Sequence, residues 1–197
     1  LVLCYASARE VTKDTLVDNK SNENRYFVRS ELGLGGYVFQ GAQHSSAFNR
    51  IPKSARALNR ELSVSLFFLE PCTAQDYCER RGSSLSRYTL EGGRFKKQRL
   101  VNGVEQMQFE YGLDEDGDSL VERYAIAHQV TDWRSVKSVR LYLLLRGNQA
   151  DQSKKGLSKT YSLGELSAYT YKPEAPQDEV FRYRIFKTEI SLKNRSG

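Results

Sequence analysis

The sequence predicts an α+β fold, in which one long N-terminal helix precedes an antiparallel β-sheet. No proline occurs before position 52, and charged residues are interleaved with apolar ones over residues 1–36. From residue 62 onward, apolar and polar residues follow the period of two that is typical of strands. The composition of 12 tyrosines and 9 phenylalanines against one methionine also favours β-structure.

The helix is predicted over residues 1–36 and the globular antiparallel-sheet head over residues 37–197. Glycine commonly ends a helix, and GLGG at 33–36 supplies that signal. The opening run LVLCYASA is shorter than the roughly 20 apolar residues of a membrane span. It is either the end of a longer apolar segment or the buried start of a core helix. Four apolar residues of the helix are expected to pack on partner helices: Leu16, Val17, Val28 and Leu32.

The strands of the head are predicted in order along the chain. Residues 41–60 form a loop with a short helix near 54–58, and alternation is clearest in SVKSVRLYLLLRG, where Val139 and three leucines share one face. In the last strand the apolar residues change faces after Ile185, which predicts a bulge. A loop is expected over 147–160. The predicted strands are LSVSLFFLE (62–70), SRYTL and RFKKQRL around the turn EGG, VEQMQFEYG (104–112), SVKSVRLYLLLRG (135–147) and EVFRYRIFKTEISLKNR (179–195).

Two cysteines lie close together in the polar segment EPCTAQDYCERRG. A disulfide between Cys72 and Cys78 would close a short loop and contribute roughly 2 kcal/mol by the chain-entropy argument. It implies an oxidising compartment. The alternative is two unrelated thiols, and Cys4 is left over in either case.

The stretch YGLDEDGDSLVER concentrates carboxylates around Gly117 and predicts either a solvated turn or a calcium loop. The strict EF-hand pattern fails, because Ser119 stands where glycine is required and the twelfth position is Ala125. Calcium accepts flexible oxygen cages, so a looser site is still open. A catalytic carboxylate pair would need an apolar pocket, which five consecutive polar residues do not suggest. The looser calcium site would use Asp114, Asp116, Asp118 and Glu122.

Two basic stretches, GGRFKKQRL and FRYRIFK, mix cations with aromatic rings, and the net charge is +6. Cations meet phosphates and rings stack on bases in sites for single-stranded nucleic acid. The alternative is a solvated sheet face, with Phe95 directed to the core. The candidate nucleic-acid residues are Arg94, Lys96, Lys97 and Arg99.

The sequence offers no catalytic signature. His44 and His128 are isolated from any H-E-x-x-H or paired C-x-x-C pattern, so zinc is not expected. GLGGYVFQG lacks the Lys-Ser/Thr of a phosphate-binding loop. We therefore expect a protein that is not an enzyme and that has no cofactor other than the calcium considered above.

Four stretches, taken in order, resemble the PilW family of type IV pilus minor pilins. They are RYFVRSELGLGGY, VNGVEQMQFEYGLDEDGD, WRSVKSVRLYLLLRG and FRYRIFKTEISLKNR, and they span residues 25–195. The resemblance implies a pilin-like fold, with a long N-terminal helix packed on the sheet. It also implies that LVLCYASA is the last piece of an apolar helix that anchors such proteins in the inner membrane.

The resemblance further implies a minor pilin that primes the filament and forms part of the tip complex. Its partners would be other minor pilins, a pilus-tip adhesin and the major pilin. Its location would be the bacterial inner membrane and periplasm and the pilus tip at the cell surface. Two alternatives stay open, a minor pseudopilin of type II secretion and a DNA-binding module of a DNA-uptake pilus.

Overall fold

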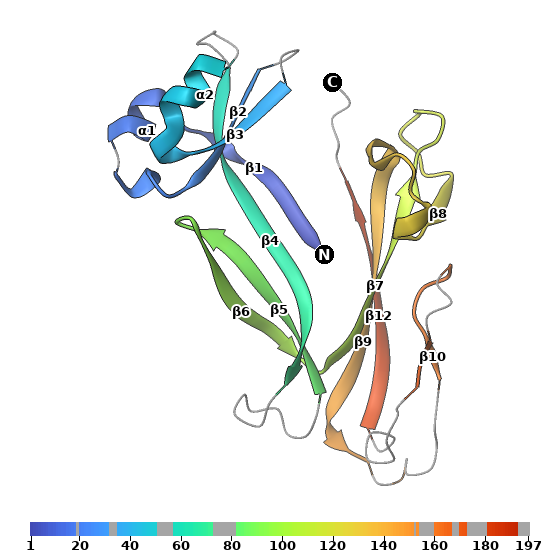
Figure 1. The fold of residues 1–197 in the computed structure, drawn as a ribbon. Coiled ribbons are helices and arrows are strands. Elements are labelled where there is room, and N and C mark those ends of the chain that lie inside the picture. Colours follow the sequence, from blue (N-terminus) through green and yellow to red (C-terminus); the bar gives the residue numbers. More distant parts are fainter. Residues whose placement is uncertain are drawn as a thin grey trace. The chain divides into compact units, whose positions relative to one another are not determined.

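The computed structural model describes residues 1–18, 20–31, 35–50, 57–72, 82–151, 153, 160–166, 170–172 and 181–192. The chain forms two compact units (Figure 1). The first unit combines Leu1–Phe68 with Ser86–Leu100, and the second combines Leu69–Leu85 with Val101–Gly197. Among the described residues, no helix is both long enough and apolar enough to cross a membrane.

The predicted helix over residues 1–36 is wrong, and so is the fold class of a long helix packed on a sheet. Strand β1 (Val2–Glu10) opens the chain, and its Cys4 pairs with Val64 in an antiparallel register. After two short helical segments, β2 (Tyr26–Glu31) shows the alternating burial of a strand. The aromatic and β-branched residues of YFV favour extended backbone, and this preference outweighs the helical spacing of Val28 and Leu32. The helical segments are α1 (Lys13–Asp18) and η1 (Lys20–Asn22).

The sheet of the first unit has the order β3-β2-β4-β5-β6, and β1 also pairs with β4. Its core contains Leu16, Phe27, Phe39 and Ala47, and the rings of Phe27 and Phe39 lie 5.7 Å apart. A short helix, α2, lies at 44–50 within the segment that was expected to be a loop. The helix predicted near 54–58 falls largely outside the described residues, which omit 51–56, and at its last residue, Leu58, β4 begins. The remaining elements are β3 (Gly35–Gln40), η2 (Gly41–Gln43), α2 (His44–Arg50), β4 (Leu58–Cys72), β5 (Gly82–Glu91) and β6 (Arg94–Asn102).

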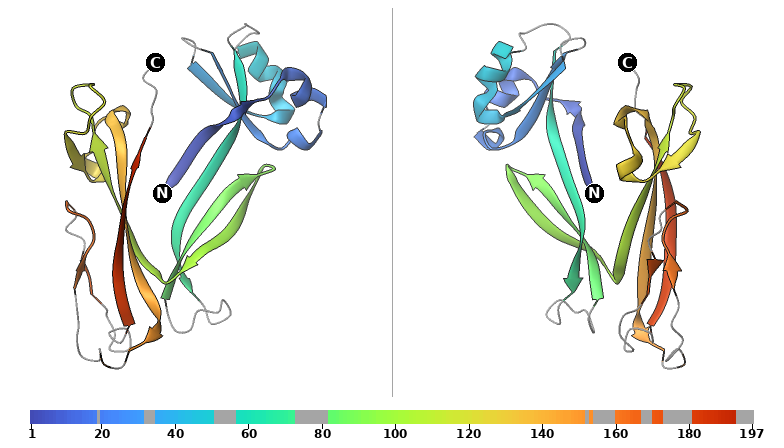
Figure 2. Two further views of the ribbon diagram at one scale, coloured as in Figure 1. Left: turned by 180° about the vertical axis from the view of Figure 1, so that it is seen from behind. Right: turned by 45° about the vertical axis from the view of Figure 1, so that its right-hand side comes forward.

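The second unit is built on a four-stranded antiparallel sheet with the order β12-β9-β7-β8. The long β9 pairs with β12 on one side and with β7 on the other. The short strands β10 and β11 form a separate pair, which runs beside the sheet in all three views (Figures 1 and 2). The elements are β7 (Val104–Leu113), β8 (Arg123–Ala125), η4 (Ala127–Gln129), η5 (Trp133–Ser135), β9 (Val136–Ala150), β10 (Tyr161–Ser162), β11 (Thr170–Tyr171) and β12 (Phe181–Ser191).

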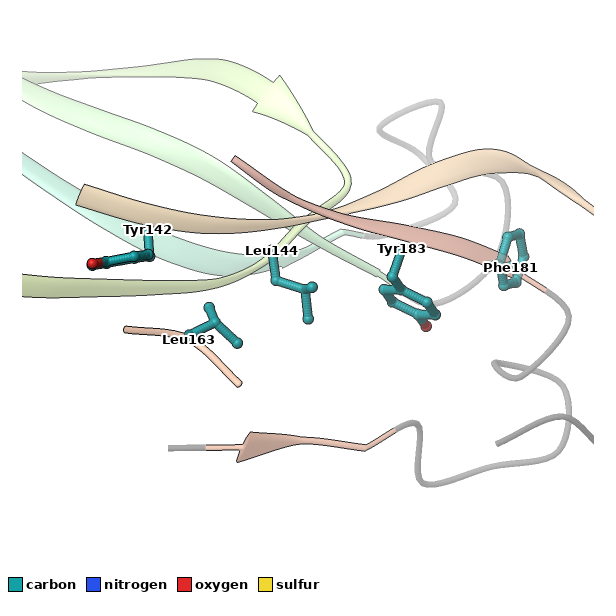
Figure 3. Packing of buried hydrophobic residues seen from close by; sticks show 5 residues of the cluster. All are labelled: Tyr142, Leu144, Leu163, Phe181 and Tyr183. Atoms are coloured by element: carbon teal, nitrogen blue, oxygen red, sulfur yellow. The ribbon is translucent and has the colours of Figure 1, made fainter. Parts of the chain in front are cut away.

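The main core of the second unit lies on the face of the four-stranded sheet that is next to β10 and β11. Leu144 and Leu163 are fully buried there, and Leu163 approaches Leu144 from the segment after β10 (Figure 3). The carboxylate of buried Glu110 holds the same segment, because it accepts hydrogen bonds from the backbone N–H groups of Glu165 at 2.6 Å and Leu166 at 2.8 Å. The cluster consists of Tyr142, Leu144, Leu163, Phe181 and Tyr183.

Two predicted details of this sheet are corrected. Strand β9 extends to Ala150, so the first residues of the predicted loop at 147–160 are strand. The register of β12 against β9 is unbroken from Tyr183 to Ser191, and its only shift precedes Tyr183. No bulge therefore follows Ile185. Ile185 and Phe186 point to opposite faces and are 42% and 50% exposed, as an edge strand permits.

Leu144 supports the core of the second unit, so Leu144→Ala is expected to lower the free energy of unfolding by about 2–5 kcal/mol through lost burial and a residual cavity. Leu120→Ala removes the same atoms from a side chain that is 66% exposed, and it should change stability by no more than about 0.5 kcal/mol. Urea unfolding of both variants measures the difference. Equal effects would contradict this core.

Candidate functional site

The carboxylate-rich stretch forms the connection between β7 and β8. Strand β7 ends at Leu113, which pairs with Arg123 at the start of β8. The nine residues between them must reverse the chain, and two of them have positive φ, 85° at Gly117 and 74° at Ser119. Glycine adopts this left-handed backbone without strain, whereas serine does so at a cost.

Four carboxylates converge within this loop. One oxygen from each of Asp114, Asp116, Asp118 and Glu122 lies within 4.8 Å of the others. Asp114 is buried, and the other three are exposed. The structure therefore brings together the four residues that the sequence analysis selected.

Backbone N–H groups of the loop point at these carboxylates. Asp114 accepts hydrogen bonds from Gly117 N at 2.6 Å and from Ser119 N at 3.1 Å. Asp116 accepts from Asp118 N at 3.1 Å, and Asp118 accepts from Leu120 N at 2.8 Å. These are the short-range bonds of aspartate-stabilised turns. The carboxylates thus have a structural role in shaping the turn.

The ammonium group of Lys137 reaches the buried member of the cluster. Lys137 Nζ lies 3.1 Å from Asp114 Oδ2, with both side chains largely shielded from solvent. Burial alone raises the pKa of Asp114, but hydrogen bonds from Lys137, Gly117 and Ser119 outweigh it, so the pKa falls below its ordinary value. Asp114 is therefore a carboxylate anchored in its ionised form.

The ligand set of the loop is made only of oxygens, the kind that calcium prefers. Ala125, which would occupy the twelfth EF-hand position, is fully buried in the apolar cluster around Leu113 and Val136. Glu122 reaches the carboxylates from the other end of the loop instead, and its Oε2 accepts from Glu115 N at 2.7 Å. The loop could hold calcium through these four residues, and calcium binding stays a prediction.

Of the four residues expected to pack on partner helices, the two whose side chains are described, Leu16 and Val28, lie in different kinds of element. Leu16 is 3% exposed and lies in the core of the first unit. Val28 is half-buried on strand β2. The side chain of Val17 and all of Leu32 lie outside the described residues.

The disulfide between Cys72 and Cys78 also lies outside what the structure describes. Cys72 ends β4, but its side chain and the whole of Cys78 are not described. Cys4 is an exposed free cysteine on β1. The disulfide therefore stays a prediction.

The candidate nucleic-acid residues all lie on β6, the edge strand of the first sheet. Arg94, Lys96 and Lys97 are exposed, and Arg99 is half-buried. Phe95 was expected to point to the core, but it is 56% exposed. Its exposure was missed because alternation identifies the faces of a strand without telling which face is covered.

Lys137 was also missed as a member of the carboxylate loop. It is separated from Asp114 by 23 positions in sequence, yet the register that pairs Leu113 with Val136 brings the two side chains together. The one signal available in the sequence is that the strand predicted over 135–147 carries Lys137 near its start, beside Val136.

The fold and the loop define an antiparallel β protein that offers long strand edges and a carboxylate-lined turn. A family model described as Type IV Pilus-assembly protein W matches residues 75–194, which is more than half of the chain and includes the whole four-stranded sheet. The chain belongs to this family. Its members take part in type IV pilus assembly in the cell envelope, and the family is not a known enzyme family. Neither the comparison with curated proteins nor the comparison with solved structures gives a match.

Acid should remove the contribution of Asp114 to stability. A carboxylate with a lowered folded-state pKa stabilises the protein above its unfolded pKa, and this stabilisation is lost as the pH falls through the folded value. We therefore expect the melting temperature to decrease as the pH is lowered below about 4, and we expect this decrease to be smaller in Asp114→Asn. Thermal unfolding from pH 7 to pH 2.5 measures it. Lys137→Met should also weaken the dependence, and an unchanged slope in both variants would contradict the anchored carboxylate.

The calcium hypothesis has its own test. If the loop binds calcium, free calcium at 100 times its dissociation constant stabilises the folded protein by about 2.7 kcal/mol. The melting temperature should then rise with calcium but not with equal magnesium, and the double variant Asp118→Asn, Glu122→Gln should abolish the rise. An unchanged melting temperature at millimolar calcium would contradict calcium binding and would mean that these carboxylates serve only to stabilise the turn.

Proposed function

We propose that this protein is a minor pilin that takes part in type IV pilus assembly by priming the filament and forming part of its tip complex. Its partners would be other minor pilins, the major pilin and a tip adhesin, and its place would be the inner membrane, the periplasm and the pilus tip. Membership of the pilus-assembly family supports a role in this machinery. The observation that carries the finer proposal is the edge strand β12.

Strand β12 provides a long edge for association. It stands at one end of the sheet order β12-β9-β7-β8 and runs for 11 residues. Edge strands are commonly blunted by proline or by being short, because their open backbone groups can pair with another chain. Residues 181–191 contain no proline, and the opposite edge, β8, has only three residues. The sheet therefore has one edge that suits pairing with another subunit.

Exposed apolar side chains lie along this edge strand. Phe186 and Ile190 lie on one face of β12 and are each 50% exposed. They stand opposite Leu143 and Val139 of β9, with half-buried Leu141 between. Aromatic side chains, phenylalanine included, are enriched at protein interfaces and contribute much of their binding energy. A subunit that adds to the edge could bury them at the same time.

A minor pseudopilin of type II secretion is the rival within the same class. Such a subunit would also need an edge for association, so the fold does not separate the two. The description of the matching family names the type IV pilus and favours the first. Association with minor pilins rather than with secretion pseudopilins decides between them.

The proposal predicts that Phe186→Asp weakens the complex between this chain and the other minor pilin heads of the same operon by about thirtyfold or more, as removing a central aromatic group does. Because Phe186 is half exposed, folding stability should change little. Light scattering after size-exclusion chromatography of the mixed heads measures association, and pilus counts on cells measure assembly.

Leu120→Asp is the matched control, since it places a carboxylate at another exposed apolar side chain, one outside the β12 edge. It should leave both association and pilus number unchanged. A complex that tolerates Phe186→Asp would refute the role of this edge. Normal pili in cells that lack the protein would refute the proposed function itself.

A further inference from the structure

Positive charge is concentrated in the β5–β6 hairpin. Residues 86–100 contain five cationic side chains and one carboxylate, a net charge of +4 out of +6 for the whole chain. The carboxylate, Glu91, lies 2.9 Å from Lys96 in an exposed ion pair. A local excess of this size attracts polyanions at a distance set by the salt concentration.

A row of aromatic rings crosses the same part of the sheet. Phe68 of β4 stacks on Tyr88 of β5, with centroids 5.1 Å apart and an interplanar angle of 15°. Tyr88 in turn meets Phe95 of β6 edge-on, at 6.4 Å. The row becomes more exposed toward the edge of the sheet, where Phe95 is 56% exposed. A phenylalanine that is exposed beside other rings is available to stack on a planar ligand.

Alternation along β6 divides its cations between two faces. Gln98 accepts a hydrogen bond from Arg87 at 2.8 Å, so the even-numbered residues of β6, including Lys96, share a face with Arg87. Phe95 contacts Tyr88 on the opposite face. Lys97 and Arg99 lie on that face with Phe95. Rings and cations therefore share the Phe95 face, which is the combination that single-stranded nucleic acids require.

We propose that the Phe95 face of the β5–β6 hairpin binds single-stranded nucleic acid. Bases stack on Phe95 and continue the row formed by Phe68 and Tyr88, while Lys97 and Arg99 lie beside the phosphates. The proposal is independent of the role of β12, because it uses other residues and another ligand. A duplex keeps its bases stacked within the helix, so it can use the cations but not the rings.

The test is a fluorescence-anisotropy titration of the full 197-residue chain against a labelled 12-nucleotide oligothymidylate at several salt concentrations. Phe95→Ala should weaken binding by at least about fivefold, as expected for the loss of one stacked base, and leave the salt dependence unchanged. Lys97→Ala should reduce the slope of log affinity against log salt by about 0.7, the value for one phosphate contact on a single strand. Phe95→Tyr keeps a ring and should keep the affinity.

Lys96→Ala is the matched control for Lys97→Ala. The two changes remove equal charge from adjacent residues, but from opposite faces of β6. The proposal requires Lys96→Ala to lower the affinity for oligothymidylate less than Lys97→Ala does. It also requires that Phe95→Ala leave the affinity for a duplex of the same length unchanged. Three results would each overturn the proposal. The first is an equal loss of affinity in both lysine variants, and the second is an absence of oligothymidylate binding at 50 mM salt. The third is that heparin and oligothymidylate bind equally well and that Phe95→Ala changes neither affinity. Circular dichroism confirms that the variants remain folded.

Discussion

The structure of the second unit depends on the register of β9. This strand pairs with β12 on one side and β7 on the other, so its alternation fixes which side chains of three strands face the core. Tyr142 and Leu144 are buried, whereas Leu141 and Leu143 are half-buried on the other face. A slip of one residue would exchange these two sets and would separate Leu144 from Leu163.

Pairing with β9 also assembles the carboxylate loop, beyond a register shift between Gly112 and Leu113 of β7. Pairing of Leu113 with Val136 sets the end of β7 beside the start of β9, and Asp114 N donates to Ser135 O at 2.8 Å. Lys137 is then within reach of Asp114, although the two are far apart in sequence. The loop is thus anchored at its first residue by the sheet, while its exposed carboxylates are held by short-range turns. Any ligand of this loop would meet a turn that is already formed.

How much of the structure could be predicted from the sequence depends on whether each feature is set by neighbouring residues or by residues far apart in the chain. Alternation and turn glycines are local, so the strands around residues 62–70, 86–100, 104–112 and 135–147 are found close to where they were expected. The four carboxylates converge because all lie in one short loop. The N-terminal region was wrong because spacing alone made Val28 and Leu32 resemble a helical face, whereas β1 and β2 form through pairing with the distant β4. Pairing of this kind leaves no mark in the local sequence.

Exposure at the sheet edges is the other property that alternation does not determine. Inside a sheet, a residue's face predicts its burial, because both neighbouring strands and the layer above shield it. At an edge one neighbour is missing, and Phe95 on β6 and Phe186 on β12 are both half exposed or more. Their surroundings differ, however. Phe95 lies in a cationic hairpin beside other rings, whereas Phe186 adjoins the leucines of β9. Because charge and aromatic stacking suit a polyanion and aliphatic contact suits a protein, the two edges of one chain can serve different ligands.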